Sequence, residues 1–223
     1  MENIWWHYLV WVLAATLLGG ALSALFAGWL HLPRRIFLVI YTVCAGVFMI
    51  AFARWSAINL LALILQNWAW GMIVGAITAA YLVVKVRSQP NSQGLRGGML
   101  FFDLGWLGLV YGLMDALFLN VIPVLATWAA FSRLGWTESW LGMVATGLLA
   151  LLASLLVTAV YHLGYPEFRN ARLGLVLFGN SMITLAYILP GNPLGAMISH
   201  ITMHIAAVLQ GPETTIQLPP HGG

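Results

Sequence analysis

The sequence predicts an all-α membrane protein, a polytopic bundle of about seven transmembrane helices. Hydrophobic residues make up 61% of its 223 residues and charged residues only 7%, whereas a typical soluble domain carries about 25% charged residues. The apolar residues also form long runs, and about 20 mostly apolar residues are enough for a helix to cross a bilayer. The same composition excludes a disordered chain, a coiled coil and a disulfide-rich secreted scaffold.

Seven apolar segments are predicted as spans, in chain order. They are Tyr8–Leu30, Ile36–Ala53, Ala57–Val84, Met99–Phe131, Trp140–Tyr165, Leu173–Pro190 and Pro193–Leu209. The first three contain no charged residue. The fourth is long enough to be tilted, or broken near Pro123, and the last two are short for full spans.

The longest polar stretch, Lys85–Gly98, divides the chain because its Pro, Asn, Ser and Gly residues mark a solvated loop. We therefore expect an N-terminal three-helix membrane segment over residues 1–98 and a four-helix core over residues 99–210. Residues 211–223 contain three prolines and read as an extended tail.

Basic residues predict the orientation. One set of loops holds Arg34, Arg35, Lys85, Arg87, Arg96, Arg169 and Arg172, whereas the opposite set holds only Arg54 and Arg133. Cytoplasmic loops carry an excess of Lys and Arg, so we expect the N-terminus outside and the C-terminus cytoplasmic, in an inner (plasma) membrane. The net charge is only +3 and no basic cluster interleaves with aromatics, so nucleic acid is excluded as a partner and membrane lipids are expected.

Four ionisable side chains lie inside the predicted core helices, where each costs about 2.5–3.5 kcal/mol and needs a function or a partner. They are Asp115, His162, His200 and His204. Asp103 lies near the end of its span, and we interpret it as a solvated or helix-terminal charge.

His200 and His204 are four residues apart, so they share one helix face. Such a pair can coordinate one metal ion, bind one substrate or supply two donors to an anion hole, and it can also simply hydrogen-bond neighbouring carbonyls. Asp115 can act in catalysis, stay neutral in a structural role or neutralise a cation such as Arg172.

Three motifs in successive core helices resemble those of the CPBP family, the CAAX protease and bacteriocin-processing membrane endopeptidases. The family carries Glu-Glu-x-x-x-Arg, Phe-x-x-x-His and His-x-x-x-Asn, and this chain has Asp115-Ala-Leu-Phe-Leu-Asn120, Thr158-Ala-Val-Tyr-His162 and His200-Ile-Thr-Met-His204 in the same order. The resemblance covers about Met99–Leu209, and only the histidines at positions 162 and 200 match the family unchanged.

The resemblance implies a CPBP-like core and an intramembrane peptidase with a membrane-tethered or prenylated peptide as substrate. Asp115 and His162 would then polarise a water, and His200 and His204 would stabilise the oxyanion. The departures leave two alternatives open. The same four residues suit a Zn²⁺ ion, and a degenerate relative would act by binding a partner or ligand without catalysis.

Overall fold

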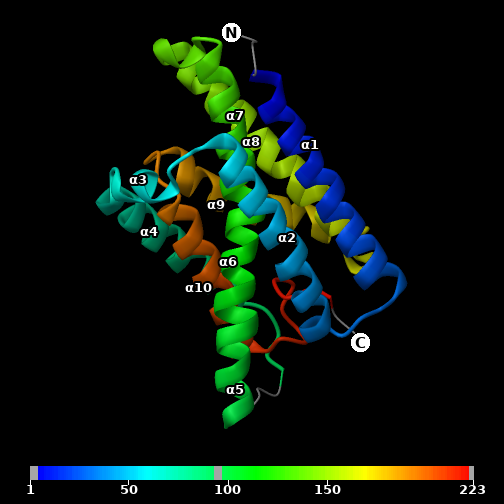
Figure 1. Cartoon of the computed structure of the whole chain (residues 1–223). Coiled ribbons are helices and arrows are strands. Elements are labelled where there is room, and N and C mark those ends of the chain that lie inside the picture. The colour runs from blue at the N-terminus through cyan, green and yellow to red at the C-terminus, as the bar shows by residue number, and fades with distance from the viewer. Residues whose placement is uncertain (1–4, 93–96, 221–223) are drawn as a thin grey trace.

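The computed structural model describes residues 5–92 and 97–220, and every regular element in that part of the chain is a helix (Figure 1). This confirms the all-α class. Among these described residues, five helices are long and apolar enough to cross a membrane: Trp5–Trp29, Arg34–Ser56, Trp68–Arg87, Gly98–Arg133 and Trp140–Leu163. Two further apolar helices, α9 (Arg172–Ile188) and α10 (Leu194–Gln210), have 17 residues each.

The first two spans match the prediction closely. Helix α1 (Trp5–Leu22) ends in a π-helical segment over Ser23–Trp29, and α2 covers Arg34–Ser56. The single third span expected over Ala57–Val84 is wrong, because the chain forms a short helix α3 (Leu60–Leu65) and then α4 (Trp68–Arg87).

The break between α3 and α4 has a local cause. Asn67 adopts a left-handed backbone conformation with φ +54°, which asparagine tolerates better than most residues. The side-chain amide of Asn192, in the α9–α10 turn, donates to the carbonyl oxygens of Leu63, Ile64 and Gln66. These bonds satisfy carbonyls that the end of α3 leaves without helical partners.

The fourth span is one continuous helix from Gly98 to Arg133, and it is not broken at Pro123. It consists of α5 (Gly98–Asp103), α6 (Tyr111–Asp115) and α7 (Ile122–Arg133), joined by π-helical segments over Leu104–Val110 and Ala116–Val121. The second π segment directly precedes the proline turn, where the ring nitrogen cannot donate a hydrogen bond.

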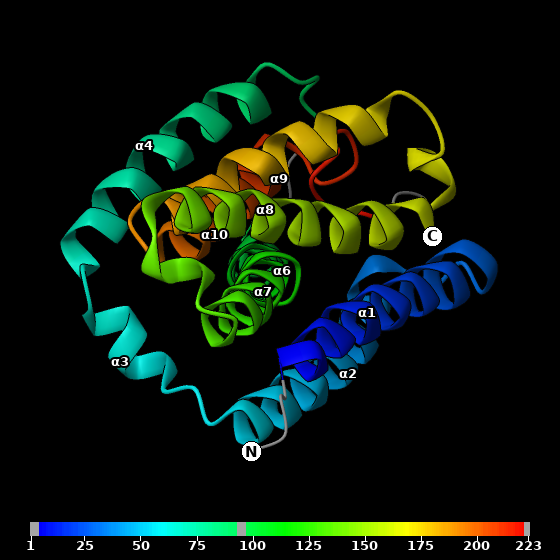
Figure 2. The ribbon, with the colours of Figure 1, turned by 90° about the horizontal axis from the view of Figure 1, so that it is seen from above.

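This long helix is the centre of the molecule. In its most apolar stretch 78% of the residues are buried, against 28–33% in the other four long helices. In Figure 2 it is seen nearly end-on, with α1 and α2 on one side and with α8 (Trp140–Leu163), α9, α10 and α4 around the other. Residues on this helix can therefore contact both halves of the bundle.

The basic loops gather at one end of the bundle together with the chain's C-terminal segment. Arg34 pairs with Glu213 at 3.3 Å, and Gln89 bonds to the backbone nitrogen of Ile216 and to the side chain of Gln217. Arg96, counted above for orientation, lies outside the described residues.

The segment 211–220 consists of turns and irregular backbone, and it is packed into the bundle. Leu218 is fully buried, and the Tyr111 hydroxyl donates to the carbonyl of Pro219 at 3.1 Å. The tail therefore packs against the helices at this end of the bundle.

Asp103 is not the solvated charge that the sequence suggests. Its side chain is 1% exposed and accepts two hydrogen bonds from Arg35, at 2.9 Å from Nε and at 2.8 Å from Nη2. Such a two-point pair ties the start of the central helix to the start of α2. The prediction failed because the partner lies 68 residues earlier in the chain.

Candidate functional site

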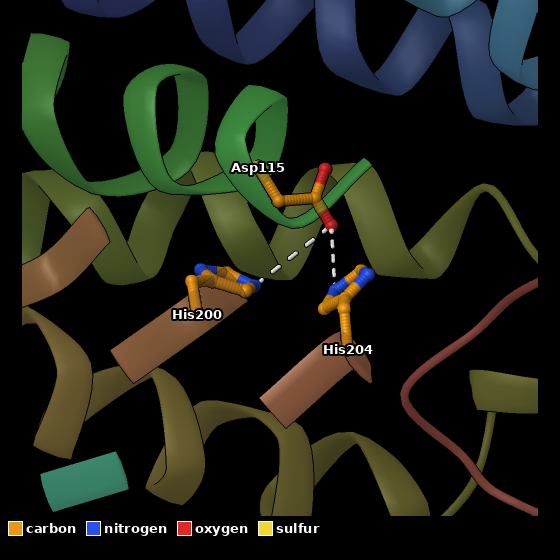
Figure 3. Close-up of side chains that lie close together, drawn as sticks. All are labelled: Asp115, His200 and His204. Carbon is orange, nitrogen blue, oxygen red and sulfur yellow. Dashed lines mark ion pairs between the residues drawn. The ribbon is translucent and has the colours of Figure 1, made fainter. Parts of the chain in front are cut away.

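Three of the four ionisable residues predicted for the core meet at one point, Asp115, His200 and His204 (Figure 3). The Asp115 Oδ2 atom lies 3.9 Å from His200 Nε2 and 3.5 Å from His204 Nε2. One donor atom from each residue lies within 4.8 Å of the other two. All three side chains are at least 95% buried, so they form a compact polar cluster inside the bundle.

The two histidines share a face of α10, as their spacing predicts. That helix packs closely on α6, because a Cβ on Gly112 would lie only 2.7 Å from the Cα of Ile201 and 3.2 Å from the Cβ of His204. Gly75 on α4 meets Gly195 in the same way, with a Cβ at 3.1 Å from the Gly195 Cα. Small residues that let helix backbones approach closely are typical of membrane helix interfaces.

Asp115 is oriented from the N-terminal half of the chain. The Tyr41 hydroxyl on α2 donates to its Oδ1 atom at 2.7 Å, and this leaves Oδ2 to face the histidines. Sequence reasoning missed Tyr41, because α2 was expected to contribute nothing to the site. The one available signal was a hydroxyl in a span whose predicted residues carry no charge.

Each histidine of the cluster makes a hydrogen bond through its Nδ1 atom to a residue other than Asp115. His200 Nδ1 lies 3.1 Å from the Oδ1 of Asn120, and His204 Nδ1 lies 3.2 Å from the carbonyl oxygen of Leu107. Both partners are acceptors, so each Nδ1 carries the proton and donates it. In the neutral ring Nε2 then has a lone pair, and both lone pairs are directed toward Asp115.

The amide of Asn120 is itself fixed, which identifies the atom that faces His200. Its Nδ2 donates to Asn180 Oδ1 at 2.8 Å and to Thr184 Oγ1 at 2.9 Å. Ser154 bridges this group to the central helix by donating to the Leu119 carbonyl at 2.7 Å. Only the carbonyl oxygen of the Asn120 amide is left for the histidine.

The π-helical segment Ala116–Val121 explains how Asp115 and Asn120 both reach α10. In an α-helix, residues five apart point about 140° away from each other. A π-helical turn closes with hydrogen bonds between residues five apart, so it brings the two side chains toward one face.

His162 lies nearby but is not a member of the cluster of three. It is buried, and its Nδ1 lies 2.8 Å from the carbonyl oxygen of Thr158, to which it donates. It lines the same cavity as Asp115, His200 and His204. The hydrogen bond to Thr158 uses Nδ1, so Nε2 is the ring nitrogen that remains for other contacts. The fourth predicted residue thus shares the cavity without joining the candidate ligand group.

The cavity has a volume of about 770 Å³, within the range of about 300–1,000 Å³ that ligand sites occupy. Its walls come from α4, the central helix, α8, α9, α10 and the tail segment 213–217. Arg172, considered from the sequence as a partner of Asp115, is exposed on this lining, and no ion pair joins the two among the described residues.

Comparison of the chain with protein-family models, with curated proteins and with solved structures finds no match. The geometry of the site and the chemistry of its residues are therefore the basis for any statement about function.

Proposed function

We propose that this chain is an integral membrane hydrolase in which Asp115, His200 and His204 hold a zinc ion. The observation that carries the proposal is the convergence of three atoms that can ligate a metal ion, Asp115 Oδ2 and the two histidine Nε2 atoms, while each histidine Nδ1 faces an acceptor elsewhere. Lone pairs that face one another in a buried site repel, and a shared cation removes that repulsion.

The separations support zinc. Zinc binds histidine nitrogen and carboxylate oxygen at about 2.0–2.2 Å, so tetrahedral ligands lie about 3.4 Å apart. The two measured separations from Asp115 Oδ2 are 3.5 and 3.9 Å, and the third is no more than 4.8 Å. Small rotations of the imidazole rings would complete the geometry.

The surroundings also fit a metal. Histidine ligands in proteins almost always donate their second ring N–H to a carbonyl or carboxylate oxygen, as His204 does to Leu107 and His200 does to Asn120. Three protein ligands leave a fourth position for water, which is the arrangement of catalytic rather than structural zinc.

A zinc ion in this site would supply a Lewis acid and an easily ionised water. His162 lines the same cavity, and we assign to it the exchange of a proton with that water or with a leaving group. The resemblance of the three motifs to the CPBP endopeptidases makes a membrane-tethered or prenylated peptide the first substrate to test.

The metal-free scheme implied by that resemblance is less well supported. It requires His200 and His204 to donate hydrogen bonds to an oxyanion, whereas each Nδ1–H already faces an acceptor and each neutral Nε2 carries a lone pair. A non-catalytic relative that binds a ligand in the cavity is the remaining alternative.

The basic residues support the expected orientation in an inner membrane. Arg34, Lys85 and Arg172 lie at the end of the bundle that holds the tail, and an excess of basic residues marks the cytoplasmic side. A reporter fused after residue 92 or at either terminus would test this placement, and a periplasmic signal after residue 92 would contradict it.

Metal content tests the proposed site directly. Wild-type protein purified from a zinc-supplemented culture should carry about one zinc per chain, measured by elemental mass spectrometry. Asp115→Ala and His204→Ala should abolish this content, whereas His31→Ala should retain it as a matched histidine control. Wild-type protein that carries no zinc and binds none on titration would refute the metal site.

Activity is tested separately with zinc-loaded protein in vesicles and a panel of membrane-tethered and prenylated peptides. Cleavage should require Asp115, and His162→Ala should lose cleavage while it keeps zinc. If zinc is bound but no peptide of the panel is cleaved, the peptidase assignment fails and the metal site stands.

A further inference from the structure

The cavity that contains the cluster is open at one end, and that end is basic. Lys85 and Arg172 both line the cavity and are both exposed. Lys85 is close to the last residue of α4, and Arg172 is the first residue of α9. Two helix ends therefore place a positive charge at the same opening.

Within the described part of the chain these two charges have no acidic partner at ion-pair distance. Among the described residues neither Lys85 nor Arg172 makes an ion pair, and the Lys85 ammonium lies over the Tyr81 ring, 5.5 Å from its centroid. Glu213 also lines this end, but it pairs with Arg34 at 3.3 Å. The positive end of the α9 helix dipole lies at Arg172 and the negative end of the α4 dipole lies near Lys85, so the two side-chain charges make the opening basic.

Beside the basic opening the cavity wall is apolar and continues to the outer surface of the bundle. Leu175 and Phe178 on α9 line the cavity, yet they are 63% and 57% exposed. Deeper in, Leu119 and Ile183 continue the apolar lining toward Asp115. In a membrane, such exposed α9 residues face lipid chains.

The depth of the cavity matches the boundary between headgroups and chains. His204 lies six residues before the end of α10, or about 9 Å inside it at 1.5 Å per residue. Basic residues at the ends of spanning helices lie at the level of lipid headgroups. The opening is thus at headgroup depth and the cluster is just below it.

We propose that this cavity binds an anionic lipid. Its phosphate or carboxylate lies between Lys85 and Arg172, and its apolar chain lies along Leu175 and Phe178. The binding depends neither on a metal nor on the proposed hydrolase function.

Photolabelling of the full chain in phosphatidylcholine nanodiscs tests the proposal. The probes are palmitic acid and phosphatidate, each carrying a mid-chain diazirine, and the neutral control is the corresponding monoacylglycerol. Both anionic probes should label peptides of α9 and α10. The probe that labels them more strongly shows whether a carboxylate or a phosphate is the preferred headgroup. Equal labelling by the neutral probe would overturn the proposal.

Charge removal provides the first matched comparison. The double variant Lys85→Gln/Arg172→Gln should lower labelling by the anionic probes about 30-fold, as the loss of two interfacial charges predicts. Arg87→Gln removes one positive charge, against two in the double variant, from an exposed position two residues beyond Lys85 and outside this cavity, and should leave labelling unchanged. Equal losses in both variants would indicate general attraction to the surface and would contradict a site.

Blocking the cavity provides a second comparison that leaves the charges in place. Gly179 lines the cavity, and neither it nor Gly174 on the same helix has any atom within 4 Å of an added Cβ. Gly179→Leu should reduce labelling severalfold, whereas Gly174→Leu, outside the cavity, should not. Unchanged labelling in Gly179→Leu would place the lipid elsewhere.

Excess inorganic phosphate and zinc-free protein complete the test. Phosphate that displaces the probes at millimolar concentration would show that the opening binds a soluble anion rather than a lipid. Labelling should be the same in Asp115→Ala, which keeps failure of the zinc site separate from failure of the lipid site.

Discussion

The Tyr41 hydroxyl on α2 lies 2.7 Å from the Oδ1 atom of Asp115 on α6 and donates a hydrogen bond to it. Both side chains are buried. The bond links the N-terminal half of the chain to the candidate site and leaves the other carboxylate oxygen to the two histidines.

Tyr41→Phe removes that donor and should weaken zinc binding about 10- to 100-fold, the usual effect of losing a group that orients a metal ligand. Competition with a zinc chelator in detergent measures the affinity. Tyr187→Phe is the matched control, because Tyr187 is also a buried tyrosine and makes no hydrogen bond to the cluster. Equal effects in the two variants would assign Tyr41 to packing alone.

Asn120→Leu should reduce zinc affinity and also destabilise the fold, because His200, Asn180 and Thr184 each lose a partner. A buried polar group left without a partner costs about 1–3 kcal/mol. Asn192→Leu should lower the melting temperature but leave zinc affinity intact, since Asn192 bonds to the end of α3. Zinc affinity that is unchanged in Asn120→Leu would contradict its role behind His200.

Gly112→Ala should disrupt the cluster by pushing α10 away from α6, because the new methyl group would lie 2.7 Å from the Ile201 Cα. We expect loss of most bound zinc and a lower melting temperature. Gly105→Ala is on the same long helix and meets nothing within 4 Å, so it should keep both properties. Normal zinc content in Gly112→Ala would show that the two helices can separate without moving the ligands.

Asp103→Asn should destabilise the protein by about 2 kcal/mol, between the values for exposed and buried ion pairs, because Asp103 is buried and Arg35 is 42% exposed. Thermal unfolding in detergent measures the change. Glu213→Gln breaks the pair with Arg34, in which the carboxylate is 67% exposed and the arginine side chain 9% exposed, and should cost less than about 1 kcal/mol. Similar losses in both variants would mean that burial of Asp103 adds nothing.

The sequence predicts the helical membrane class well because apolar length alone specifies it. All five long helices overlap predicted spans, and α9 and α10 overlap the sixth and seventh. The break at Asn67 was missed, since the carbonyls it exposes are satisfied by Asn192, more than 120 residues later. Composition cannot predict a hydrogen-bond partner that lies so far away in the chain.

The candidate site could be predicted only in part. The spacing of His200 and His204 predicts that they share one helix face. Because ionisable residues are rare in apolar helices, both histidines and Asp115 are also predicted as functional residues. Neither spacing nor scarcity could identify Tyr41, because tyrosine is common in spanning helices. Whether His162 would join the other three depended on how α8 packs, and it reaches the shared cavity rather than the cluster.

The π-helical segments on either side of α6 make the central helix sensitive to its residue count. Because hydrogen bonds there close over five residues, each segment holds a residue that an α-helix of the same length would lack. Deleting one residue between Leu104 and Val110 would restore ordinary winding there and leave Asp103 facing as it does relative to Asp115, whereas inserting one residue would turn α5, with Asp103, by about 100°. After such an insertion either Arg35 or the two histidines would lose the carboxylate that they contact, so an inserted residue here should be tolerated far less well than a substitution or a one-residue deletion.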